Sequence, residues 1–226
     1  MKHKKVFDKV RKLIDERESG DENLETARDE LFAIVENDSD SDSAYAFLSE
    51  INYWLGENAE DADDKLAFYE EGVACGESGI EINEDSLEAN FWLSVNSGSY
   101  GQEKGIMQSL AMISPIKAAA EKALKLDESY FYGGPHRVLG RLYNKAPGFP
   151  FSIGSNKKAI EHLEKAVKLA PKFFLNHLFL AEAYISNRDK AKAKEQLEWI
   201  LNAPLNKKHE REDEDYKRQA SMLLES

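Results

Sequence analysis

Residues 159–171 read AIEHLEKAVKLAP, and residues 193–204 read AKEQLEWILNAP. Both segments carry small or apolar residues at a spacing of four and then three, and both end close to a proline. The first has Ala159, Leu163 and Ala166, and the second has Ala193, Leu197 and Ile200. Residues spaced in this way lie on one face of a helix, and a small residue there lets a neighbouring helix approach closely. The recurrence predicts a fold built from helical repeats.

Weaker copies of the triplet lie earlier in the chain. They comprise Ala27, Leu31 and Ile34; Gly72, Gly76 and Gly79; and Ile116, Ala120 and Ala123. Leu139-Gly140 followed by Tyr143 precedes one block, and Leu180-Ala181 followed by Tyr184 precedes the next. These spacings resemble the tetratricopeptide (TPR) pattern, in which a small residue pairs two helices, a large one fills the gap and proline ends the unit.

Helical periodicity recurs along the whole chain, and alternating strand patterns are almost absent. The sequence therefore predicts an all-α fold, a TPR-like right-handed α-solenoid of about five helix pairs. A capping helix is expected within 204–226, and residues 1–226 are expected to form a single domain.

In the Gly72 copy all three positions are glycine, which costs about 1 kcal/mol each in helix propensity relative to alanine. This cost indicates an unusually close helix contact there.

Charge and cysteine content exclude several classes of protein. The 226 residues carry a formal net charge of −12, so the chain as a whole repels phosphate backbones and anionic membranes. We therefore expect no nucleic acid as a partner, and no segment is apolar enough for membrane insertion. The one cysteine, Cys75, excludes an internal disulfide.

The basic start of the chain is not followed by the apolar core of a signal peptide. The sequence predicts a cytoplasmic protein, or a periplasmic one if an export signal has been removed.

Two stretches carry a more specific pattern. The first is ANFWLSVNSG, residues 89–98, which contains Trp92 and Gly98. The second is YGGPHRVLGRLY, residues 132–143, whose pattern residues are Gly133, Gly134, Pro135, Gly140 and Tyr143. Together they resemble the T component of TRAP (tripartite ATP-independent periplasmic) transporters and, more distantly, the regulator of microtubule dynamics family. The resemblance covers about residues 43–203.

The resemblance implies an all-helical, non-catalytic protein that works by binding. It implies a protein partner, in the transporter family a solute-binding protein, and a homo-oligomer with a pore or groove for small ligands. A TPR adaptor in the cytoplasm, gripping a partner peptide or helix without a transport role, is the alternative. Nucleophile elbows, phosphate loops, dinucleotide fingerprints and HExxH are absent from the sequence, so we expect no enzyme activity and no cofactor. We also expect no metal site, although His162 and His177 lie on neighbouring predicted helices.

The family register also predicts which side chains line a concave face, where the first helices of successive pairs meet. The inward positions would be Glu50, Tyr53, Phe91, Val95, Arg137, Arg141, Asn144, Leu178, Glu182 and Ile185. Arg137 and Arg141 are four residues apart and could hold the carboxylate or phosphate of a small organic anion. In the other interpretation Glu182 neutralises Arg141, and the face is a solvated salt-bridge surface.

Overall fold

The computed structural model describes residues 3–20 and 22–225. Contacts within the chain divide it into two compact units, Met1–Leu126 and Asp127–Ser226. The first unit holds six α-helices among its described residues: α1 (Lys4–Asp15), α2 (Glu22–Asn37), α3 (Asp42–Asn58), α4 (Ala62–Ile82), α5 (Leu87–Lys104) and α6 (Ile106–Leu126). A short 3₁₀ turn, Arg17–Ser19, follows α1.

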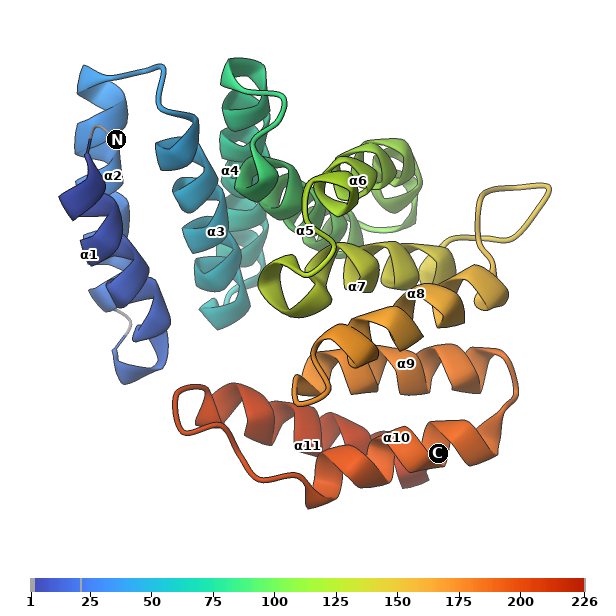
Figure 1. Cartoon of the computed structure of the whole chain (residues 1–226). Helices are drawn as coiled ribbons and strands as arrows, with labels where there is room; N and C mark the ends of the chain where they lie inside the picture. The colour runs from blue at the N-terminus through green and yellow to red at the C-terminus, as the bar shows by residue number, and fades with distance from the viewer. Residues whose placement is uncertain (1–2, 21, 226) are drawn as a thin grey trace. The chain divides into compact units, whose positions relative to one another are not determined.

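The second unit continues the same pattern (Figure 1). Its helices are α7 (Tyr130–Lys145), α8 (Asn156–Leu169), α9 (Phe174–Ser186), α10 (Lys190–Asn202) and α11 (Glu210–Glu225). No strand occurs in the described residues, where the one β-bridge joins Gly148 to Gly154. The prediction of an all-α chain with five helix pairs and a terminal helix is confirmed. That residues 1–226 form a single domain stays a prediction.

Within each unit the helices pack as TPR repeats do. Each helix contacts the next one along the chain, and first helices of adjacent pairs also touch, as α3 touches α5 and α7 touches α9. The predicted triplets lie on the second helix of each pair, and all fifteen of their residues are buried. A stripe of small or apolar residues on one face of a helix lets that helix pack closely against its neighbours.

The glycine triplet of α4 marks a close contact with α5, as predicted. A Cβ atom on Gly76 would lie 2.8 Å from Cβ of Leu93 and 2.9 Å from its Cα, and one on Gly79 would lie 2.8 Å from Cβ of Ala89. On Gly72 the Cβ would overlap the amide of Asn96. Backbone atoms cannot move aside as a flexible side chain can, so only glycine fits at Gly76.

We expect Gly76→Ala to lower the free energy of unfolding by about 1–3 kcal/mol, because the added methyl group overpacks the contact with Leu93. Gly98→Ala in α5 is the matched control, since a Cβ there meets no atom within 4 Å. That control should gain up to about 1 kcal/mol from helix propensity. Thermal unfolding measures both. A Gly76→Ala melting temperature equal to that of the control would show that α4 and α5 can separate without cost.

Candidate functional site

The glycine-containing turn at the start of α7 has an uncommon backbone conformation. Phe131, Tyr132 and Gly133 have φ values of 45°, 62° and 72°, so three successive residues lie in the left-handed region. This region is costly for residues with a side chain and ordinary for glycine. A Cβ on Gly133 would also lie 3.1 Å from Cα of Ala166. Pro135 follows in the first regular turn of the helix, where its missing N–H does no harm.

Arg137 holds this turn in place. The side chain is buried, and its Nη1 donates to the carbonyl oxygens of Phe131 at 3.3 Å and Tyr132 at 3.4 Å. The same nitrogen lies 3.0 Å from Oδ1 of Asn176, whose amide nitrogen donates to the Tyr132 carbonyl at 3.0 Å. The guanidinium also lies 4.9 Å from the centre of the Phe173 ring. Arg137 therefore acts inside the second unit as a positioning residue.

Arg141, one turn further along α7, has different surroundings. Its guanidinium lies 4.3 Å above the Phe179 ring and pairs with the Glu182 carboxylate. Lys145 reaches the same carboxylate at 2.5 Å and is half exposed. The amide nitrogen of Asn144 is buried and has no hydrogen-bond partner among the described residues. We call Arg141, Asn144, Lys145, Phe179 and Glu182 the α7–α9 cluster.

The cluster carries one more positive than negative charge. Burial by itself would raise the pKa of Glu182, but Arg141 and Lys145 outweigh it and hold that pKa below its usual value. Glu182 is therefore ionised at neutral pH and shared between two cations. The contact between Arg141 and Glu182 is the one that the salt-bridge interpretation requires.

The other predicted inward residues are distributed as follows. Tyr53 is half-buried on α3 and its ring centre lies 5.5 Å from that of Trp92. Phe91 is fully buried on α5, and Val95 is half-buried one turn later. These three belong to the first unit, whereas Arg137, Arg141, Asn144 and Glu182 belong to the second.

Two further predicted inward residues, Leu178 and Glu50, are buried. Leu178, which was expected to face inward, is fully buried in a core with Phe174 and Leu197, just as Phe91 is fully buried in the first unit. Phe179, which the sequence analysis missed, stands beside Arg141 in its place. Glu50 is buried and accepts two hydrogen bonds of 2.8 Å from Arg11 of α1. A cavity of about 70 Å³ next to this pair is far smaller than a typical small-molecule site of roughly 300–1,000 Å³.

Three further pattern residues, Trp92, Gly140 and Tyr143, serve packing. Trp92 lies in the core of the first unit, with its ring centre 6.0 Å from that of Trp54. Gly140 makes room for Leu163, since a Cβ there would lie 2.5 Å from Leu163 Cγ. Tyr143 is buried and stacks on His162 with ring centres 5.7 Å apart. Gly98 has open space around its Cα, so nothing in the structure explains its glycine.

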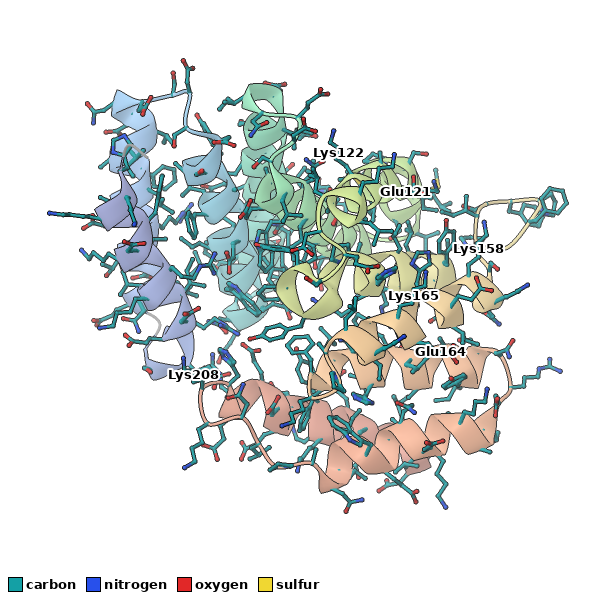
Figure 2. The ribbon with its side chains drawn as sticks, in the orientation of Figure 1. Glu121, Lys122, Lys158, Glu164, Lys165 and Lys208 are labelled. Carbon is teal, nitrogen blue, oxygen red and sulfur yellow. The ribbon has the colours of Figure 1, made fainter. Side chains whose placement is uncertain are left out.

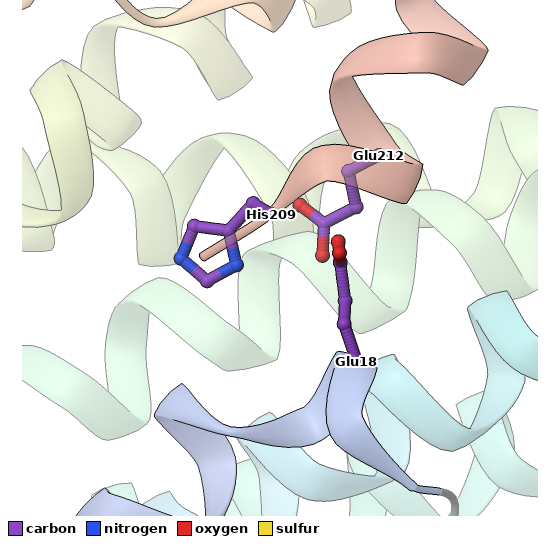
Figure 3. A group of neighbouring side chains, drawn as sticks. All are labelled: Glu18, His209 and Glu212. Atoms are coloured by element: carbon purple, nitrogen blue, oxygen red, sulfur yellow. The ribbon is translucent and has the colours of Figure 1, made fainter. Parts of the chain in front are cut away.

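His162 and His177 contact different partners. Nδ1 of His162 lies 2.9 Å from Nδ1 of His136, and His177 instead contacts Gln196 and the Pro171 carbonyl. His209 and Glu212 lie at the start of α11 (Figure 3). Taken by itself, neither unit brings three potential metal ligands together among its described residues.

Family models match most of the chain. That of the TRAP transporter T-component matches residues 79–226, and that of the regulator of microtubule dynamics proteins 1-3 matches residues 6–146. No curated protein matches the chain. None of the described helices is long and apolar enough to span a bilayer.

Two solved structures share the fold. A thermophilic TPR protein from Thermus thermophilus is 16% identical, with 97% of this chain and 99% of that chain covered and a TM-score of 0.69. The MamA protein is also 16% identical, with 91% and 98% covered and a TM-score of 0.55. At this identity the likeness shows that the fold is TPR-like.

We expect Arg137→Lys to lower the free energy of unfolding by about 2–3 kcal/mol, because a lysine lacks the planar guanidinium that stacks on Phe173 while it donates hydrogen bonds to the turn. Arg141→Lys keeps a charge beside Glu182 on a partly exposed surface and should cost about 1 kcal/mol or less. Urea unfolding of the two variants measures the difference. Equal losses would contradict the distinct roles of the two arginines.

We also expect acid to destabilise the second unit through its buried histidines. Burial lowers the pKa of His177 from its ordinary 6.5, and hydrogen bonds to Gln196 and Pro171 oppose this without outweighing it. Since the unfolded chain then binds more protons, stability is full above pH 6.5 and falls below it. The melting temperature of the wild type should be lower one pH unit below 6.5 than one unit above it. In His177→Gln this difference in melting temperature should be smaller. An unchanged difference would exclude His177 as its source.

Proposed function

Because this chain belongs to the TRAP transporter T-component and RMD1-3 families, we propose that it is a non-catalytic binding protein that recognises an acidic segment of a partner protein. In TPR-like folds the first helices of successive pairs line one continuous surface, which suits an extended partner. The partner that the transporter family implies is a solute-binding protein.

The α7–α9 cluster is the binding surface of this proposal. The observation that carries it is that Arg141 and Lys145 share one carboxylate, so that a second carboxylate can be accommodated. Lys145 is half exposed, so its ammonium group can reach a carboxylate of the partner. A carboxylate held by such donors forms charge-assisted hydrogen bonds. The Phe179 ring offers an apolar contact to the residue beside that carboxylate.

Binding to the solute-binding protein of a TRAP transporter from the same organism tests the proposal. Isothermal titration should show binding by the wild type, and at least about tenfold weaker binding by Arg141→Ala/Lys145→Ala, because charge-assisted hydrogen bonds are lost. Glu182→Gln should bind at least as tightly as the wild type, because it removes the carboxylate that competes for both cations. Lys207→Ala/Lys208→Ala is the control that removes two exposed positive charges elsewhere in the second unit.

Three results would contradict the proposal. Equal affinities for the wild type and the Arg141→Ala/Lys145→Ala variant would place the binding surface elsewhere. No binding by the wild type would rule out the solute-binding protein as the partner. If organic acids such as succinate raise the melting temperature of the wild type and the receptor does not bind, the cluster recognises a small organic anion instead.

A further inference from the structure

The loop between α7 and α8, residues 146–155, projects away from the helices that it joins (Figure 1). Phe149 is 93% exposed and Phe151 is 87% exposed, with Pro150 between them. No other aromatic side chain of the described residues is as exposed as these two. Large apolar side chains that stand together in water usually mark a surface that another molecule covers.

Backbone hydrogen bonds give this loop a defined shape. The Gly154 N–H donates to the Pro147 carbonyl at 2.8 Å, and the Phe151 N–H donates to the Gly148 carbonyl at 3.0 Å. At the base, the Ser155 N–H donates to the Tyr143 carbonyl at 2.8 Å. The tip is therefore held in one conformation, which reduces the entropy lost when it binds.

Positive charge surrounds the base of the loop. The Asn156 side chain donates to the Ser186 carbonyl at 2.9 Å, which brings the turn between α9 and α10 beside the loop. Lys158 projects from α8, and Lys165 follows two turns later on the same face (Figure 2). The cations on the turn and on the helix ends that flank the loop and the turn are Lys145, Lys157, Lys158, Arg188, Lys190, Lys192 and Lys194, and the carboxylates that pair with four of them are Glu161, Glu182, Asp189 and Glu198.

The acidity of the chain does not extend to this region. Residues 1–126 hold 28 acidic and 13 basic side chains, whereas residues 127–226 hold 14 acidic and 17 basic ones. The net charge of −12 therefore arises in the first unit, and the second unit carries a small positive charge. The expectation that the chain repels anionic surfaces applies to the first unit.

We propose that the α7–α8 loop is a peripheral docking element for an anionic lipid surface. Phe149 and Phe151 would enter the interface between headgroups and acyl chains, where aromatic side chains are favoured. The lysines at its base would lay their stems along the apolar region and place their ammonium groups at lipid phosphates. A projecting apolar tip ringed by cations fits a soft, negatively charged surface without a complementary pocket. This inference does not rest on the proposed protein partner, and Lys145 is the one residue that the surroundings of the loop share with the α7–α9 cluster.

Flotation with vesicles tests the proposal. The full chain should float with vesicles made of phosphatidylcholine and phosphatidylglycerol in equal amounts, and much less with phosphatidylcholine alone. Phe149→Ser/Phe151→Ser should bind the mixed vesicles roughly tenfold more weakly or worse. Lys157→Glu/Lys158→Glu should weaken binding as well, and added salt should weaken the wild type. The control is Ile106→Ser/Met107→Ser, which removes an apolar pair that is 80% and 82% exposed from the acidic first unit and should bind as the wild type does.

Both substituted phenylalanines are exposed, so the melting temperature of that variant should equal that of the wild type. Absence of wild-type binding to mixed vesicles would overturn the proposal and point to a protein pocket as the cover for the tip. Equal binding by the wild type and the phenylalanine variant would overturn it too. Binding that is equally strong with and without phosphatidylglycerol would show that the cations take no part, which contradicts the proposed site.

Discussion

The close approach of neighbouring helices at small residues is the constraint on which the structure depends. Along α4 and α5 the backbone at Gly76 lies so near Leu93 that even a methyl group overlaps it. In the second unit Gly140 of α7 receives the side chain of Leu163 from α8. The glycines lose helix propensity, and the buried stripes that they permit offset that loss through packing and burial. Because the two helices of each pair are held at a short distance, the orientation of their exposed faces is fixed as well.

The turn at the start of α7 shows how this constraint reaches the candidate site. Gly133 lies against the backbone of Ala166, which leaves the preceding residues little choice of path and puts Phe131 and Tyr132 in the left-handed region. Such a conformation persists only where its surroundings determine it. Arg137 and Asn176 supply those surroundings by bonding the exposed carbonyl groups. The same turn sets the path of α7 and thus the position of Arg141, one turn beyond Arg137.

The sequence was sufficient to predict the repeats because the small-large-small triplets act through local spacing. It could not predict that the two arginines have different roles, because residues four apart lie on the same face of a helix. Their roles diverge because Arg137 faces a left-handed turn and Arg141 faces Phe179, and both neighbours are set by tertiary packing. The same limit explains the exchange of Leu178 and Phe179. Adjacent apolar residues differ by one helical step, and either could have faced the core.

Charge shows a related limit of chain-wide quantities. The net charge of a whole chain describes its surface only when acidic and basic residues are evenly distributed. Here the acidic excess lies before residue 127. Exposed charges are screened beyond about 10 Å at 0.1 M salt, so a partner senses the local excess. For the second unit that excess is positive in two places, at the α7–α9 cluster and at the base of the α7–α8 loop. Lys145 ends α7 and belongs to both, so a carboxylate bound at the cluster would reduce the positive charge available at the loop. Protein and lipid binding would then oppose each other through this one side chain, and Lys145→Ala would weaken the coupling between them.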